Sequence, residues 1–139
     1  MLKGCAQACA RASGSSFGTL LAVAFLTAAK STGDRAGLDR AALVDLLDVV
    51  GAALSQRGGA AQGDKTMLDS LAAIASALRH AKELSPQALK SAAQFAAQEA
   101  LDAFRNRPNR IGRARMFADR SIGLDDPGMV AVQRMVQAL

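Results

Sequence analysis

Arginine and glycine residues gather between residues 112 and 128 in a pattern that could hold an anion. Arginines and glycines alternate there with single apolar residues, and the segment closes on Asp126-Pro127-Gly128. Asp126 can cap a helix that begins at Pro127, because the amide hydrogen that proline lacks would have no partner in the first helical turn. Guanidinium groups and free backbone amides beside a helix start can bind an anion. A purely structural loop would show the same pattern, so both interpretations stay open.

A second candidate is the turn Ser13-Gly14-Ser15-Ser16, which separates two apolar stretches. Ser15 or Ser16 can cap the helix that follows. Hydroxyl groups and free backbone amides at such a helix start suit a phosphate group. A turn that only connects two helices has the same composition, so this turn alone does not indicate a site.

The remaining reactive side chains have simpler interpretations. Cys5 and Cys9 are four residues apart, on one face of a helix, where a disulfide would strain the backbone. Asp45 and Asp48 lie off the apolar stripe of their helix, which favours a solvated face over a metal site. His80 is near the end of a helix, where the helix dipole favours a positive charge. We assign no catalytic residue among them.

These candidates are positioned by helices. Half of the 139 residues are hydrophobic but only 4% are aromatic, and no segment alternates with period two as a half-buried strand would. Helical spacing, caps and breakers predict about six helices. The first two are residues 2–12 and 17–30, and the third is capped by Asp39. The fourth is residues 65–80, capped by Asp64; the fifth begins at Ser85-Pro86 and stops before Pro108; and the sixth is residues 127–139. The fifth helix carries apolar residues that include Phe95, and the last helix is predicted to place Met135 and Leu139 largely inward. Short connections imply antiparallel neighbours, and the expected fold is an all-α antiparallel bundle.

The charge and hydropathy exclude some classes of partner. The formal charge is +5, but few aromatic side chains interleave with the arginines, so we do not expect a nucleic-acid partner. The most apolar run, residues 17–29, is too short for a membrane span and predicts a buried helix. No targeting segment stands out, so we expect a cytoplasmic protein without a membrane partner.

Three segments together resemble the nucleotide-binding L subunit of dihydroxyacetone kinases (Dak2 or DhaL type). They occur in the family's order and approximate spacing: Ala12-Ser13-Gly14-Ser15-Ser16-Phe17-Gly18, Gly63-Asp64-Lys65-Thr66-Met67-Leu68-Asp69, and Gly112-Arg113-Ala114 through Arg120-Ser121-Ile122-Gly123 to Asp126-Pro127-Gly128. The resemblance covers essentially the whole chain. It implies a barrel of eight antiparallel helices with ADP or ATP at one end, of which residues 1–139 would form a single domain equivalent to the last six helices, the C-terminal two-thirds of the family domain.

The resemblance also implies roles for particular residues. Ala12 and Ser13 would hold the nucleotide phosphates, Gly58 and Met67 would border the adenine, and Arg113 would contact the nucleotide. The segment that closes over the nucleotide would be Asp126, Pro127 and Gly128. Asp64 and Lys65 would be structural for their loop.

Other positions depart from the family pattern. The family binds two magnesium ions through a Gly-Asp-x-Asp-His-Gly loop between two earlier helices, and these 139 residues contain no such motif. Ser15 and Ser16 replace a more apolar pair, and Leu124 replaces a common histidine. Because phosphoryl transfer relies on metal to offset charge, we expect the isolated chain to be inactive and its affinity for nucleotide to be weak or vestigial.

The leading hypothesis is a nucleotide-binding L-type domain that phosphorylates dihydroxyacetone or a similar hydroxyketone held by a separate K-type subunit. The resemblance leaves open whether a phosphotransfer protein recharges bound ADP. The alternative is a non-catalytic helical binding or regulatory module derived from that fold. Because apolar faces cover more than one stripe of the second and third helices, we also expect a homo-oligomer.

Overall fold

The computed structural model describes residues 1–12 and 14–139, apart from the side chains of residues 113, 114 and 117. The prediction of an all-α fold is confirmed, because the described residues form helices and no strand. The elements are α1 (Leu2–Ala12), α2 (Ser16–Thr32), α3 (Arg40–Gly58), α4 (Met67–Arg79), α5 (Pro86–Arg105), the 3-10 helix η1 (Arg113–Ser121) and α6 (Pro127–Gln137). Their contacts divide the chain into two compact units, Met1–Gly59 and Ala60–Leu139.

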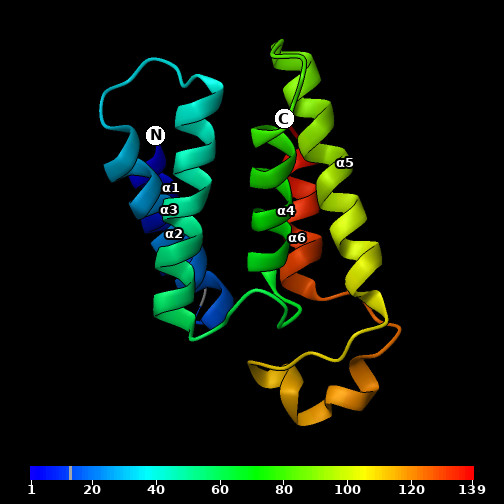
Figure 1. Cartoon of the computed structure of the whole chain (residues 1–139). Helices are drawn as coiled ribbons and strands as arrows, with labels where there is room; N and C mark the ends of the chain where they lie inside the picture. The colour runs from blue at the N-terminus through cyan, green and yellow to red at the C-terminus, as the bar shows by residue number, and fades with distance from the viewer. Residues whose placement is uncertain (13) are drawn as a thin grey trace. The chain divides into compact units, whose positions relative to one another are not determined.

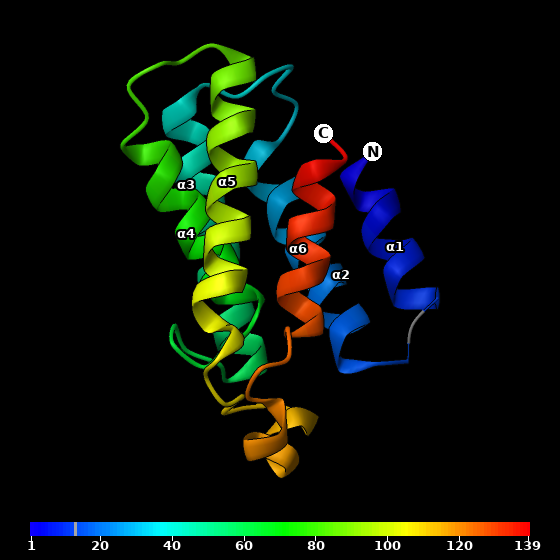
Figure 2. The same ribbon diagram turned by 90° about the vertical axis from the view of Figure 1, so that its right-hand side faces the viewer.

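The first unit consists of three helices that follow one another in alternating directions (Figures 1 and 2). The middle helix, α2, packs against both α1 and α3. Small residues allow this packing: Gly18 and Ala22 are the buried residues of α2. At the end of α3, a Cβ added to Gly58 would lie 3.4 Å from a methyl carbon of Leu20.

The second unit packs α4, α5 and α6 against one another. In Figures 1 and 2, α4 and α6 run in the same direction and α5 runs in the opposite one. The start of α4, the end of α5 and the start of α6 therefore meet at one end of this unit, and η1 extends beyond that end. Ala100, Leu101 and Met129 form a buried cluster between α5 and α6.

Most predicted helix starts are confirmed by their caps. The side chains of Asp39, Ser85 and Asp126 accept hydrogen bonds from the backbone amides three residues later, at 2.8, 3.2 and 3.0 Å. Ser15 caps α2 in the same way, with Gly18 N donating at 3.2 Å. Each bond satisfies one of the amides that the first helical turn leaves without a partner.

Two predictions about where helices lie were wrong. The fourth helix begins at Met67 and is capped by Thr66, because Thr66 and Asp69 form a capping box and Asp64 instead accepts a bond from Ala61 N. Residues 113–121, which were expected to be loop, form η1.

Phe95 is one of the apolar residues of α5, yet it is 67% exposed because small alanines form most of the packed face of this helix. Met135 and Leu139, which were predicted to face inward, are exposed near the end of α6. Across the part of the chain that the structure describes, each helix falls short of the length and apolar character that a membrane crossing requires.

Candidate functional site

The start of α4 is shaped by one buried carboxylate. The Asp69 side chain is 5% exposed. Its Oδ1 accepts a hydrogen bond from Gly63 N at 2.6 Å, and its Oδ2 accepts one from Thr66 N at 2.8 Å. Asp69 therefore fixes the turn that leads into α4, and Gly63 adopts the positive φ of 97° that this turn requires.

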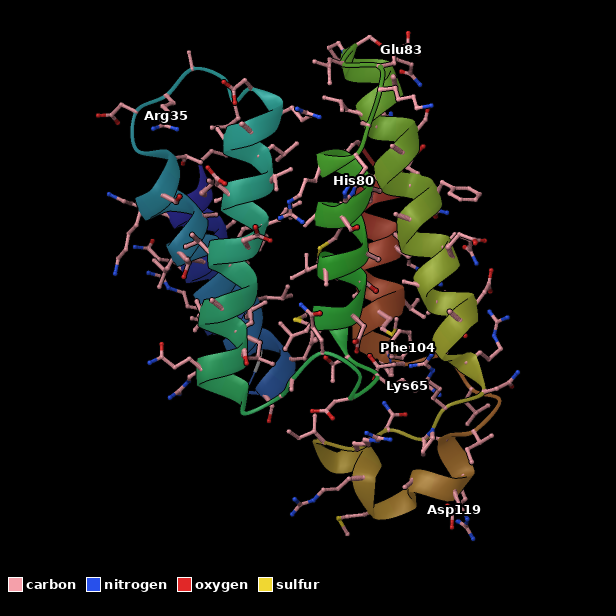
Figure 3. The ribbon with its side chains drawn as sticks, in the orientation of Figure 1. Arg35, Lys65, His80, Glu83, Phe104 and Asp119 are labelled. Carbon is pink, nitrogen blue, oxygen red and sulfur yellow. The ribbon has the colours of Figure 1, made fainter. Side chains whose placement is uncertain are left out.

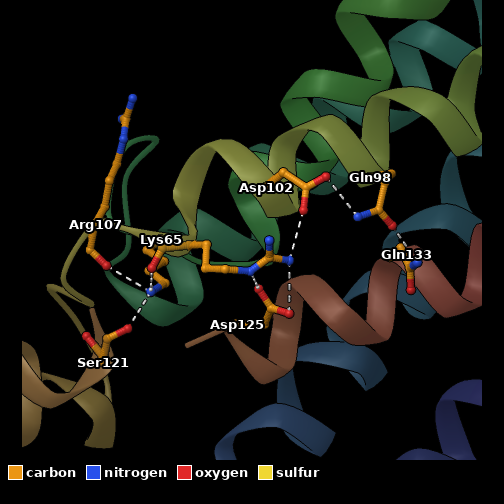
Figure 4. A network of polar contacts seen from close by, with 8 residues as sticks. Lys65, Gln98, Asp102, Arg107, Ser121, Asp125 and Gln133 are labelled. Atoms are coloured by element: carbon orange, nitrogen blue, oxygen red, sulfur yellow. Dashed lines mark hydrogen bonds and ion pairs between the residues drawn. The ribbon is translucent and has the colours of Figure 1, made fainter. Parts of the chain in front are cut away.

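Lys65 lies inside that turn and is completely buried. Its Nζ donates to three backbone carbonyl oxygens, those of Arg105 at 3.0 Å, Arg107 at 2.8 Å and Ser121 at 2.7 Å (Figure 4). Burial lowers the pKa of the Lys65 ammonium, although the carboxylates of Asp126 and Asp125 act to raise it. The three carbonyls replace the water that a lysine normally keeps around its charge.

Asn109 connects Lys65 to the start of α6. Its Nδ2 donates to Lys65 O at 2.9 Å and to Asp126 Oδ2 at 3.0 Å. Its backbone amide donates to Ser121 Oγ at 2.8 Å. Asn109 is 5% exposed, so these bonds satisfy a buried amide that would otherwise be costly.

The carboxylate of Asp126 belongs to the same network. Its Oδ1 accepts from Met129 N as the cap of α6, while its Oδ2 accepts from Asn109. Burial raises the pKa of this carboxyl above its ordinary value, against the opposing effects of its hydrogen bonds and of the Lys65 charge.

Gly128 lets the first turn of α6 approach the start of α4 closely. A Cβ at this position would lie 3.0 Å from Asp126 Oδ1 and 3.5 Å from Met67 N. The predicted residues Met67, Asp126 and Gly128 therefore lie together, with Pro127 in the same turn.

A more exposed chain of polar contacts leads away from this network along α5 and α6. Arg105 binds Asp125 through Nε at 2.8 Å and Asp102 through NH2 at 2.8 Å. Gln98 donates to Asp102 and accepts from Gln133 (Figure 4), and the Gln98 bond lowers the pKa of Asp102. Because Arg105 and Asp102 are more than a third exposed, these ion pairs contribute little stability.

The predicted site residues are divided between the two units. Ala12 ends α1 and Gly58 ends α3, both in the first unit. Ser13 lies outside the described residues. Arg113 opens η1 in the second unit, but its side chain is not among those described. Figure 3 shows Lys65 and Phe104 at one end of the second unit and His80 at the other, so the histidine is remote from the network.

Basic side chains surround the outer surface of this end. Arg107 lies over the ring of Phe104, 4.4 Å from its centre. A shallow hollow of about 360 Å³ on η1 is lined by Arg115, Met116, Ala118, Asp119 and Arg120, so one carboxylate lies among its guanidinium groups. This donor set suits an anion such as a phosphate. The described residues contain no group of three or more His, Cys, Asp or Glu side chains that could hold a metal ion.

Sequence reasoning missed two residues of this network. Asn109 was not singled out, and its side-chain partners are 44 residues before it and 17 residues after it, at separations that leave no local pattern. Asp69 was quoted in a motif without a role. Its position three residues after Thr66 was the capping-box signal that could have located the start of α4.

Comparison with known proteins shows the family. The DAK2 domain model matches residues 1–139. The chain is 35% identical over 131 residues to the ADP-binding subunit DhaL of the PEP-dependent dihydroxyacetone kinase of Escherichia coli, covering 92% of this chain and 60% of that protein. It is 33% identical over 133 residues to the L-erythrulose 1-kinase of Mycolicibacterium smegmatis, covering 96% of this chain and 23% of that protein.

A third relative is the L-erythrulose kinase of Pectobacterium atrosepticum, which is 31% identical over 142 residues and is covered over 24% of its length. The chain thus spans between 23% and 60% of the length of these relatives. The resemblance inferred from the three sequence segments is confirmed. The chain belongs to the DAK2 domain family.

Proposed function

We propose that this chain acts as the nucleotide-binding, L-type domain of a hydroxyketone kinase, with its two compact units as parts of one domain. The observation that carries the proposal is the family match over residues 1–139. The relatives are a subunit of a dihydroxyacetone kinase and kinases of erythrulose. The substrate class is therefore dihydroxyacetone or a similar short-chain hydroxyketone.

The nucleotide is ADP or ATP, and the residues assigned to it are those that the family resemblance implies. In the second unit, Met67 borders the adenine, Arg113 contacts the nucleotide, and Asp126-Pro127-Gly128 closes over it. The close packing of Gly128 on Met67 and the basic surface around η1 support this assignment. In the first unit, Ala12 and Ser13 hold the phosphates and Gly58 borders the adenine.

Nucleotide titration tests this assignment. We expect the 139-residue chain to bind ADP weakly, and chelation of magnesium to change the affinity little. Arg113→Ala should weaken binding several-fold, whereas Arg134→Ala, which removes an equal charge from the exposed end of α6, should leave it unchanged. Nuclear magnetic resonance titration up to millimolar ADP measures both. Equal affinity of the Arg113→Ala variant and the unchanged chain would remove Arg113 from the site.

Phosphoryl transfer needs more than these residues. When bound, magnesium offsets the charge that develops on the transferring phosphoryl group. Since the described residues hold no cluster of metal ligands, we expect no turnover of dihydroxyacetone by this chain with ATP and magnesium, even beside a competent K-type subunit. A coupled steady-state assay checks this, and turnover above background would contradict it.

The proposed partners follow from the family. A K-type subunit holds the hydroxyketone, and a phosphotransfer protein is the second candidate partner because one relative is named as PEP-dependent. We place the protein in the cytoplasm, where these partners and its nucleotide occur. Self-association is also proposed, since Leu26, Val49 and Phe95 are large apolar side chains that are more than 40% exposed. Light scattering after size exclusion tests it, and a stable particle of single-chain mass would exclude a homo-oligomer.

The alternative is a non-catalytic binding or regulatory module that kept the fold. The absence of a metal-ligand cluster among the described residues favours this module over a catalytic domain. ADP titration separates the two. Binding that Arg113→Ala weakens supports the nucleotide-binding domain, and no binding up to millimolar ADP supports the module.

A further inference from the structure

The ammonium of Lys65 ties together two segments that bracket η1. Arg105 and Arg107 precede η1, and Ser121 ends it, yet their carbonyl oxygens all accept hydrogen bonds from the same nitrogen. The Nζ of a protonated lysine has three hydrogens, and the three bonds use all of them. The base of the segment 107–121 is therefore closed on a single side chain that comes from the start of α4 (Figure 4).

A lysine at position 65 has two energetically unfavourable features. The φ angle of Lys65 is 62°, and among the residues that the structure describes Lys65 is the only non-glycine residue with a positive φ. Its side chain is also 0% exposed, although lysine is almost never fully buried unless its charge is paired. A glycine at this position would remove the unfavourable backbone angle, and an apolar side chain would remove the cost of burying a charge. A residue with both an unfavourable backbone angle and a buried charge persists only where the surrounding structure requires it. Here the surrounding structure requires the ammonium group of Lys65.

The same network reaches the other proposed nucleotide residues of the second unit. Met67 follows Lys65 by two residues and begins α4. Asn109 joins the carbonyl of Lys65 to the carboxylate of Asp126. The segment that carries Arg113 and the segment Asp126-Pro127-Gly128 are thus both held against the turn that contains Lys65.

We propose that Lys65 is a positioning residue that holds η1 and the start of α6 in place for nucleotide binding through Arg113, without contacting the nucleotide itself. The inference rests on the proposed function. A lysine in a Gly-Asp-Lys-Thr turn before a helix suggests a direct phosphate ligand. The three carbonyl bonds leave its ammonium no hydrogen for a phosphate oxygen.

Limited proteolysis with an arginine-specific protease tests the positioning directly, without nucleotide. Lys65→Met removes the ammonium, and Lys65→Arg keeps the charge but offers a planar fork that cannot reach the same three carbonyls. We expect cleavage after Arg107, Arg110 or Arg120 to become at least about tenfold faster in both variants, because the segment opens locally. The matched control, Lys82→Met, changes an exposed lysine of the same unit and should leave the rate unchanged.

Cleavage after Arg79 distinguishes local opening from general loss of structure. Arg79 is the last residue of α4 and lies far from Lys65 along that helix. Faster cleavage within residues 107–120 at an unchanged Arg79 rate supports the inference. Equal cleavage of the Lys65 variants and the unchanged chain would overturn it, as would an equal increase at Arg79. If Lys65→Met does not fold, Lys65→Arg alone carries the comparison.

A double-mutant cycle tests whether Lys65 acts through Arg113. ADP affinity is measured for the unchanged chain, Lys65→Arg, Arg113→Ala and the double variant. If the lysine acts by placing the arginine, the double variant should bind no more weakly than Arg113→Ala, so the two effects are not additive. Full additivity would overturn the inference. Failure of the unchanged chain to bind ADP would overturn the proposed function instead, and the proteolysis result would still decide whether Lys65 holds the segment.

Discussion

The starts of α4 and α2 are both capped by a hydroxyl side chain, Thr66 and Ser15, but they are built differently. At the start of α4, buried Lys65 makes hydrogen bonds to residues that are 40, 42 and 56 positions away in the sequence. At the start of α2, Ser15 makes local bonds, from Gly18 N to its hydroxyl and from the Thr19 hydroxyl to its carbonyl. The hydrogen bonds at the start of α4 therefore connect segments that are distant in the sequence, whereas those of Ser15 cap its own helix.

This difference predicts how each start responds to substitution. A buried polar network is stable when every member has its partners, and the loss of one member leaves the others desolvated without a bond. The carbonyls of Arg105, Arg107 and Ser121 share one donor, so a change at Lys65 affects several groups at once. An exposed cap has water as a substitute partner, so its loss affects mainly its own helix.

The largest expected effect is on stability at Lys65. Lys65→Met should lower the free energy of unfolding by on the order of 3 kcal/mol, because three hydrogen bonds to a charged donor are lost together. The carbonyl oxygens of Arg105 and Ser121 each keep one backbone donor, from Gly123 N and Leu124 N. Lys82→Met, at an exposed position, should change it by less than about 0.5 kcal/mol. Urea unfolding followed by circular dichroism measures both values. A loss below about 1 kcal/mol at Lys65 would mean that the two helix starts do not differ in the way described.

The next largest effect is expected where α6 meets α4. Gly128→Ala should destabilise the chain by about 1–3 kcal/mol, because the added carbon would lie 3.0 Å from the capping oxygen of Asp126, which has to shift by a few tenths of an ångström. Gly51→Ala is the matched control, since Gly51 lies within α3 with no atom close to the added carbon. The control should stabilise the chain by about 0.5–1 kcal/mol through the helix preference of alanine. The same sign for both substitutions would show that the contact at Gly128 is not tight.

A smaller effect is expected at the start of α2. Ser15→Ala should cost about 1 kcal/mol, the usual value for loss of a serine cap. Ser85→Ala removes a cap of the same 3.2 Å length from α5 and should cost the same. Thermal unfolding of the two variants makes the comparison. A much larger loss at Ser15 would indicate that its turn, like the one at Lys65, joins distant parts of the chain.

The sequence predicted the features of the fold that depend on local pattern. Helical spacing and the capping residues Asp39, Ser85 and Asp126 located three helix starts, because a cap acts within three residues. The start of α4 was misplaced at Asp64, since the capping box of Thr66 and Asp69 competes for the same turn. The exposure of Phe95 was not predicted, because the packed face of α5 is made mostly of alanines, which give a weak apolar signal beside a phenyl ring.

The candidate site was less accessible to sequence reasoning. Family resemblance located Met67 and Gly128, which the structure brings together. Lys65 was recognised as structural, but its three carbonyl partners carry no sequence signal because every residue has a backbone carbonyl. Asn109 was missed for a similar reason, since its partners depend on how α5, η1 and α6 fold back. Long-range polar networks of this kind are visible only once the chain is folded.

The smallest expected effect is that of Asp126→Asn. This variant tests whether the negative charge where α4 meets α6 contributes to stability, or only the hydrogen bonds there. Asp126→Asn keeps a good capping acceptor and removes the carboxylate. Burial raises the pKa of Asp126 above the ordinary value of 3.8, so the folded chain binds this proton more tightly than the unfolded chain. The contribution of Asp126 to stability is therefore fully present below pH 3.8 and is lost as the pH rises through the raised pKa.

The asparagine variant lacks this titration, so its stability relative to the unchanged chain should rise with pH across that window and then level off. Urea midpoints of both chains between pH 3 and 7 measure the difference, with Asp119→Asn as the control for a carboxylate on the exposed surface of η1. A difference that falls with rising pH would mean that the attraction of the Lys65 charge outweighs the burial of Asp126. The junction would then be held by charge as well as by the bonds that distinguish it from the start of α2.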